Sequence, residues 1–308
     1  MGILSVSVDL DEVRCYHDIH GLKTPNANTD DLICRRALPR IGELFDKLNI
    51  KGTFFAVGRD LREDLATAGL LKGLADKGHE IANHTMNHRY DLTVLPPNEQ
   101  RAEISNGADA IAQAIGKRPK GFRAPGYNVH LGLLDIVEEL GYKYDSSVFP
   151  CPAYLAAKTA AIGIKSALGA KSQSLIGDPR ILLAPTGPYR LGRDGVWTKG
   201  DGMYELPISV VTAARIPFIG TTLSLMGRRP ASIMAKVIKR SRFLNLELHA
   251  IDFIDADGDG LGYLAAHQPD LKISYTKKLA TLTKVLEVLI NSGMSTMSLY
   301  DASQRVFI

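Results

Sequence analysis

The chain has 308 residues, of which 45% are hydrophobic and 23% are charged, and its formal net charge is +4. This composition is that of an ordinary globular protein and excludes a disordered or fibrous chain. The charge is mild and no dense run of basic residues is present, which argues against a nucleic-acid binder. An anionic substrate and a membrane surface are both compatible with it.

The three cysteines, Cys15, Cys34 and Cys151, are an odd number and show no spacing typical of a zinc knuckle or a redox pair. The N-terminal segment reaches Asp9 before it could form the apolar core of a signal peptide. No stretch has the apolar length needed to span a bilayer. We therefore expect a soluble cytoplasmic protein, at the inner face of the membrane if its substrate is lipid-linked.

Short apolar runs typical of strands alternate with amphipathic helical stretches along the chain. In chain order, the expected strands are 3–8, 52–58, 79–84, 120–125, 142–147, 244–250 and 294–302. The expected helices between them are 39–50, 60–78, 98–116, 131–141 and 275–293. This alternation predicts a single α/β domain over 1–308 with a parallel sheet, closed as a barrel of about seven units. A Gly- and Pro-rich stretch at about 151–240 interrupts the pattern and is expected to be an irregular insertion.

Polar side chains of ligand type follow one expected strand after another. They are Asp9, Asp11, His84, His88, Arg123, Asp145 and His249. The carboxyl ends of parallel strands converge on one mouth of an α/β fold, where active sites lie. We therefore expect these residues, which are scattered in the sequence, to meet in space.

His84 and His88 are four residues apart, a spacing at which two histidines on one helical turn can share a metal ion. Two surface histidines near a helix start are the alternative, and an isolated pair favours it. Two histidines and one carboxylate, from Asp9 or Asp11, would leave an open coordination position, as in catalytic zinc sites. A cation there activates water, and the second carboxylate then takes the proton. An acidic cap of the strand is the alternative for the two aspartates.

Five segments, "SVDLDE", "HTMNH", "FRAPGY", "YDSS" and "LELHAID", occur in an order and at separations that resemble the polysaccharide deacetylase family. This family carries the NodB-homology domain and is of the carbohydrate esterase family 4 type. The resemblance covers 1–150 and 240–300 and points to a branch with an Asp-x-Asp first motif. It implies a distorted (β/α)7 barrel, here with the insertion.

The resemblance implies that Asp9 is the catalytic base and that Asp11, His84 and His88 hold one divalent metal ion, expected to be Zn²⁺. Glu12 is the alternative third ligand. A surface ion pair would otherwise explain Arg123, and a buried structural role would explain His249.

The resemblance assigns Arg123 the task of holding the base in its ionised form. It assigns the backbone N–H of Gly126, or that of Tyr127, to the developing oxyanion. His249 becomes the general acid that protonates the leaving amine, and Asp145 orients it.

The implied activity is metal-dependent hydrolysis of an N-acetyl or N-formyl group on an amino sugar, small or lipid-linked rather than polymeric. The alternatives are an amidohydrolase of the same fold acting on a non-sugar amide, and a carbohydrate-binding relative without turnover. Tyr127 and Trp197 are expected to contact the substrate, with loop packing as the alternative for Trp197. The segments 154–172 and 215–227 either pack on the barrel or make peripheral membrane contact. No nucleic-acid partner is expected, and the oligomeric state is left open.

Overall fold

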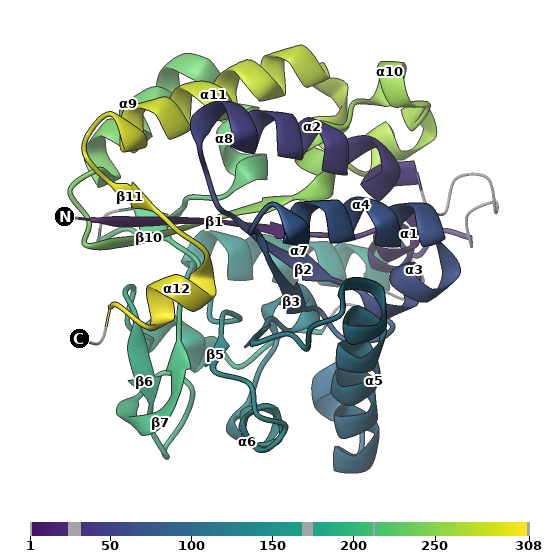
Figure 1. Ribbon diagram of the computed structural model, residues 1–308, viewed down its shortest axis with the longest axis vertical. Coiled ribbons are helices and arrows are strands. Elements are labelled where there is room, and N and C mark those ends of the chain that lie inside the picture. Colours follow the sequence, from purple (N-terminus) through teal and green to yellow (C-terminus); the bar gives the residue numbers. More distant parts are fainter. Residues whose placement is uncertain (1, 24–31, 168–174, 212, 307–308) are drawn as a thin grey trace.

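The computed structural model describes residues 2–23, 32–167, 175–211 and 213–306 (Figure 1). Its centre is a sheet in the order β10-β1-β2-β3-β4-β5-β7-β6, with β11 beside β1. A separate hairpin pairs β8 with β9. The strands are β1 (Ile3–Asp9), β2 (Thr53–Ala56), β3 (Glu80–Asn83), β4 (Gly121–Phe122), β5 (Tyr144–Asp145), β6 (Tyr189–Leu191), β7 (Lys199–Glu205), β8 (Val210–Val211), β9 (Ile216–Pro217), β10 (Phe243–His249) and β11 (Ser295–Thr296).

The sheet curls into a distorted barrel. From β10 through β1 to β7, every neighbouring pair of strands is parallel. After β7 the chain continues in an extended segment, in which the Ile208 N–H donates to the Val148 carbonyl and the Ser209 N–H donates to the Asn245 carbonyl. The second bond reaches β10, so the two ends of the parallel sheet come together. The predicted fold class is confirmed.

Helices surround the sheet, with α2 and α4 on one side of β1 to β3 and α5 and α6 further along (Figure 1). The core between the sheet and these helices contains Val6, Phe45, Leu71 and Leu282, which are fully buried. The helices are α1 (Val13–His20), α2 (Leu32–Leu48), α3 (Gly58–Glu63), α4 (Leu65–Asp76), α5 (Pro97–Ile115), α6 (Leu131–Glu139), α7 (Pro152–Ala167), α8 (Gly220–Met226), α9 (Arg228–Ile238), α10 (Ala256–Asp259), α11 (Tyr275–Ile290) and α12 (Leu299–Ser303).

The neighbouring strands β1 and β10 each have one apolar and one polar face. Their register pairs Ser7 with Glu247 and Asp9 with His249, and alternate residues of a strand share a face. The intervening Val8 and Leu248 belong to the apolar core. The polar face therefore looks into the barrel and carries ionisable groups to its carboxyl end.

The seventh parallel strand is not the one that the sequence predicted. Within the expected strand at 294–302, only Ser295–Thr296 pairs with β1, and the chain then enters α12. The seventh strand is β7, which lies inside the stretch assigned to the insertion. Its sequence, KGDGMYE, begins with exposed Gly, Lys and Asp residues, which have low strand propensity. Pairing with β5 and β6 decides its conformation.

No helix among the described residues is long and apolar enough to cross a bilayer. Of the segment 154–172, the part up to residue 167 belongs to α7, and residues 168–172 lie outside the described ranges.

Candidate metal centre and active site

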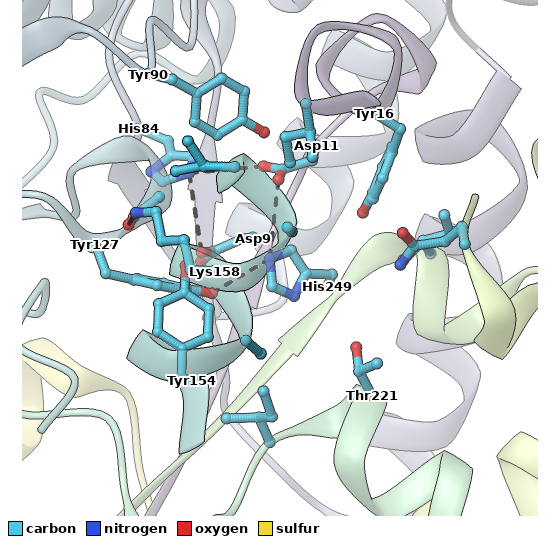
Figure 2. Close-up of a pocket in the computed structure, with 18 residues that line it drawn as sticks. Asp9, Asp11, Tyr16, His84, Tyr90, Tyr127, Tyr154, Lys158, Thr221 and His249 are labelled. Carbon is cyan, nitrogen blue, oxygen red and sulfur yellow. Dashed lines mark hydrogen bonds and ion pairs between the residues drawn. The ribbon is translucent and has the colours of Figure 1, made fainter. Parts of the chain in front are cut away.

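The carboxyl ends of the parallel strands bring the predicted residues together. Asp9 ends β1, His84 follows β3, Arg123 follows β4 and His249 ends β10. Figure 2 shows Asp9, Asp11, His84 and His249 around one cavity. The residues converge because all these strands run in the same direction.

Asp11, His84 and His88 form a buried cluster whose ligand atoms all lie within 4.8 Å of one another. Asp11 Oδ1 lies 3.1 Å from His88 Nε2 and 3.6 Å from His84 Nε2. His84 Nδ1 donates to the Arg123 carbonyl at 2.7 Å. Because a carbonyl only accepts, this bond fixes the tautomer and leaves the Nε2 lone pair facing the cluster.

The two histidines converge through a turn rather than on one face of a helix. Thr85 and His88 both have positive φ, 69° and 54°, and the His88 N–H donates to Thr85 Oγ1 at 3.1 Å. Left-handed backbone at residues other than glycine is costly and is typical of functional sites. The turn places the rings of His84 and His88 4.8 Å apart.

The chemistry of the cluster fits a divalent metal ion. Asp11 Oδ1 and both ring nitrogens of His88 are buried and make no hydrogen bond of good geometry, since the 3.1 Å contact between Asp11 Oδ1 and His88 Nε2 is an ion-pair approach, although buried polar atoms normally have a hydrogen-bond partner. Burial lowers the pKa of His84 to about 4, so its ring is neutral and can bind a metal at neutral pH. Burial alone would raise the pKa of Asp11, but the neighbouring histidines hold it below its usual range. Two histidines and an ionised carboxylate are the ligand set of catalytic zinc sites.

Asp9 is fixed by Arg123. Arg123 Nη1 donates to Asp9 Oδ1 at 2.5 Å, and Asp9 Oδ2 lies 3.8 Å from His84 Nε2. The guanidinium also donates to the carbonyl and hydroxyl oxygens of Ser146 and to Ser7 Oγ, and it lies over the ring of Phe55. The contact between Arg123 and Asp9 that the sequence predicted is present. It leaves Asp9 Oδ2 as the free oxygen beside the cluster of Asp11, His84 and His88.

His249 is oriented by Glu247. His249 Nδ1 lies 2.8 Å from Glu247 Oε1, and Nε2 lies 3.8 Å from Asp11 Oδ2. Burial would lower the pKa of His249, but the charge and hydrogen bond of Glu247 raise it well above the usual value. The ring is therefore protonated near neutral pH and can donate a proton from Nε2.

The prediction that Asp145 orients His249 is wrong. Asp145 accepts hydrogen bonds from the Ser147 hydroxyl at 2.7 Å and from the Ser147 N–H at 3.0 Å. Ser147 Oγ in turn accepts from the Ala124 N–H. Because β5 pairs with β4 and β7 rather than with β10, Asp145 stabilises the turn beside Arg123 instead.

The predicted oxyanion residues lie at the cavity, which both Gly126 and Tyr127 line. Both have positive φ, 63° and 61°. A Cβ at Gly126 would meet the ring of Tyr90 at 3.1 Å, so glycine suits this position. Lys158 Nζ donates to the Gly126 carbonyl at 2.9 Å and holds the turn from the side of α7. The Tyr127 hydroxyl donates to Glu247 at 3.2 Å and lies 3.3 Å from the His249 ring.

Two other expectations are settled by the contacts. The Glu12 carboxylate accepts from the N–H groups of Val13, Ile33 and Cys34, so it caps α1 and α2 and is not the third ligand. Trp197 does not line the cavity. It precedes the amino end of β7, at the opposite end of the barrel, and Arg180 stacks on its ring at 4.1 Å.

The cavity has a volume of about 320 Å³. Its polar groups gather at the strand ends, while much of its wall is aliphatic. The aliphatic lining residues are Ile19, Ala157, Ala161, Ile162, Ile219 and Ile251. Lys158, whose pKa burial lowers to about 8, lies in the wall contributed by α7 (Figure 2).

Sequence reasoning missed Glu247 and Lys158. Glu247 had a usable signal, because it stands two positions before His249 in the same strand and so shares its face. Lys158 had no such sequence signal, since a single lysine in an apolar helix is most simply explained as a solvent-exposed residue.

The fold and these side chains define a parallel α/β barrel with a buried cluster of two histidines and one carboxylate at its carboxyl mouth. Residues 27–144 match the family model for polysaccharide deacetylase. Over this part of its length, the chain is similar to polysaccharide deacetylases.

Three curated relatives illustrate the similarity. A peptidoglycan deacetylase-like protein of Gibberella zeae is 34% identical over 118 residues, which are 37% of this chain and 33% of the relative. A peptidoglycan deacetylase of Helicobacter pylori is 24% identical over 47% of this chain and 49% of its own. A chitooligosaccharide deacetylase of Bradyrhizobium is 29% identical over 36% and 50%. The chain thus spans about a third to a half of the length of these relatives.

Two solved structures share the fold. One, from Mycobacterium smegmatis, is classed with the polysaccharide deacetylases and has 18% identity and a TM-score of 0.52 over 96% of this chain and 93% of that one. The other is a CE4 family pseudoenzyme from Bacillus anthracis, with 12% identity and a TM-score of 0.52 over 98% of this chain and 65% of that one. At these identities the likeness concerns the fold alone.

Proposed function

We propose that this protein is a metal-dependent hydrolase that removes an N-acetyl or N-formyl group from an amino sugar. The observation that carries the proposal is the buried cluster of Asp11, His84 and His88. A carboxylate, Asp9, and an imidazole, His249, lie beside it. The Asp9 carboxylate is held by the Arg123 guanidinium, and Glu247 raises the pKa of His249 and keeps its ring protonated. A base and an acid with opposite protonation at one pH are what amide hydrolysis requires. The names of the relatives, deacetylases of peptidoglycan and chitooligosaccharide, agree with this proposal.

A divalent cation held by the cluster would lower the pKa of water and polarise the amide carbonyl. The residues supply the proton transfers. Asp9 Oδ2 accepts the proton of the attacking water, because Oδ1 is engaged by Arg123. His249 Nε2 delivers a proton to the departing amine nitrogen. The backbone N–H of Gly126 would stabilise the oxyanion, because the N–H of Tyr127 already donates to the Ala124 carbonyl at 3.1 Å.

For the substrate we propose a small or lipid-linked amino sugar rather than a polymer. The aliphatic wall formed by α7, Ile219 and Ile251 supports this, since a carbohydrate chain offers mainly hydroxyl groups. An apolar group next to the sugar would bury against this wall. We further place the activity in the cytoplasm, and subcellular fractionation tests that placement.

The test is a release assay with metal-loaded protein. N-acetyl and N-formyl amino sugars are supplied free, nucleotide-linked, lipid-linked and as oligomers, and acetate and formate are quantified. Release from a sugar substrate, removed by chelation and restored by Zn²⁺, is the expected result. Release only from non-sugar amides would favour the alternative amidohydrolase. Metal and sugar binding without any release would place the protein with non-catalytic relatives and overturn the proposal.

A further inference from the structure

The outer face of α8 and α9 exposes aliphatic side chains. α9 buries Ala231, Met234, Ala235 and Ile238, and it packs against α11 at the edge of the molecule (Figure 1). On the opposite face, Ile233 is 63% exposed and Val237 is 56% exposed. At the end of α8, Leu225 is 55% exposed, and Met226 beside it is also exposed. Exposed aliphatic side chains that gather on neighbouring helices are typical of an interaction site.

Basic residues are interleaved with these aliphatic ones. Arg229 and Lys236 are exposed and recur with Ile233 and Val237 at intervals of three or four residues, so they share the outer face of α9. Arg240, also exposed, lies in the turn directly after the end of α9. Arg228, also exposed, begins the helix directly after α8. We call these four basic residues and the four aliphatic ones the α8–α9 patch.

The charge of this region is one-sided. Between Glu205 and Glu247 the sequence contains seven Arg and Lys residues and no Asp or Glu. The chain as a whole has a net charge of only +4, so the remainder of the protein is slightly acidic. The positive charge is therefore concentrated on the segment that forms the patch.

We infer that the α8–α9 patch docks peripherally on an anionic lipid bilayer. Exposed aliphatic residues flanked by Lys and Arg on one helical face are the pattern of helices that lie in the membrane interface. The cations are attracted to anionic headgroups, and the aliphatic side chains enter the acyl boundary. A nucleic-acid surface would match the charge but would leave the four aliphatic side chains without a partner.

The patch lies close to the cavity along the chain. Ile219 and Thr221 line the cavity where α8 begins, and Figure 2 shows Thr221 on this helix. The seven residues of α8 span about 10 Å, and its far end carries Leu225 and Met226. Docking through the patch would therefore bring the cavity near the membrane surface. The inference itself concerns binding and does not depend on the proposed hydrolysis.

The experiment is co-sedimentation of the full chain with vesicles. One set contains phosphatidylcholine alone, and the other contains phosphatidylcholine mixed with phosphatidylglycerol. We expect binding to the anionic vesicles that weakens with added salt, and far less binding to the neutral ones. The combined variant Arg229→Glu, Lys236→Glu and Arg240→Glu should bind at least about 100-fold more weakly, at about fivefold for each cation.

Two further variants separate the contributions. Ile233→Ser with Val237→Ser keeps the charge and should still weaken vesicle binding, because the aliphatic contact is lost. Lys117→Glu with Lys120→Glu changes exposed cations after α5 and should bind like the unaltered protein. All substituted side chains are exposed, and circular dichroism checks that the variants are folded.

Equal vesicle binding by the patch variants and the unaltered protein would overturn the inference, as would the absence of binding to anionic vesicles. Two results together would assign the patch to polyanions and would also overturn the inference. They are loss of affinity for duplex DNA in the Arg229, Lys236 and Arg240 variant, and normal vesicle binding by the Ile233 and Val237 variant.

Discussion

The two sides of the barrel use buried carboxylates differently. On the side of β1 and β10, Asp11 keeps Oδ1 without a hydrogen bond, and Glu247 directs Oε1 at His249. On the side of β5, Asp145 is as deeply buried, but both of its carboxylate oxygens accept hydrogen bonds from Ser147 in the same turn. A buried charge at a strand end therefore indicates chemistry only when its hydrogen-bonding capacity is directed at the cavity. Substitutions of Asp9, Glu247 and Asp145 test this contrast, from the largest expected effect to the smallest, and a fourth prediction concerns His79.

Asp9→Asn should leave the metal bound and lower kcat by about 10²–10⁴-fold. The three ligands are untouched, but the amide cannot accept the proton of the attacking water. The measurement is turnover of the sugar found by the release assay, together with metal content by atomic emission. Asp11→Asn is the matched control and should lose both metal and turnover. Full activity in Asp9→Asn would remove Asp9 from the mechanism.

Glu247→Gln should lower kcat by about 10²-fold with little change in KM. The neutral amide no longer favours the protonated ring of His249 or fixes its orientation, while the shape of the side chain is kept. Steady-state kinetics give the split between kcat and KM, and Glu247→Asp should restore part of kcat. An unchanged kcat in Glu247→Gln would mean that Glu247, like Asp145, only stabilises the fold.

Asp145→Ala should lower stability rather than kcat, with a loss of about 1–3 kcal/mol in the free energy of unfolding. The Ser147 hydroxyl and N–H groups would be left buried without their acceptor. Urea denaturation measures the loss, and Ser147→Ala is a smaller version of the same change. If Asp145→Ala instead reduced kcat as strongly as Glu247→Gln with no loss of stability, the contrast between the two sides would fail.

His79, away from both sides of the site, should make folding stability depend on pH. It packs against Phe45 and Phe54 and accepts from the Gly52 N–H, and burial lowers its pKa to about 4. The unfolded chain thus takes up the proton first, so this contribution is complete above about pH 6.5 and is lost as the pH falls towards 4. Between about pH 7 and pH 5 the loss should be about 1–2 kcal/mol.

The comparison variant is His79→Asn, whose side-chain oxygen can still accept from Gly52. Urea unfolding of both proteins at the two pH values gives the difference. Equal pH dependence in the variant and the unaltered protein would show that His79 does not titrate in this range.

Much of the site could be predicted from the sequence. Strand–helix alternation indicated the barrel, and the residues after successive strands included Asp9, Asp11, His84 and Arg123, which do meet. This worked because side-chain chemistry and strand ends are local properties, and parallel strands carry their carboxyl ends to one mouth. The wrong assignments concern pairs of residues on different strands.

Tertiary structure alone decided those pairs. Asp145 does not orient His249, because β5 pairs with β4 and β7 rather than with β10. Trp197 lies far from the cavity because β7 is a parallel strand of the barrel. The residues that precede β7 therefore lie at the amino end of the barrel, opposite the cavity. The sequence by itself determined which chemical groups this protein carries and near which strand ends. The order of the strands, which depends on long-range backbone pairing and helix packing, decided which of those groups touch.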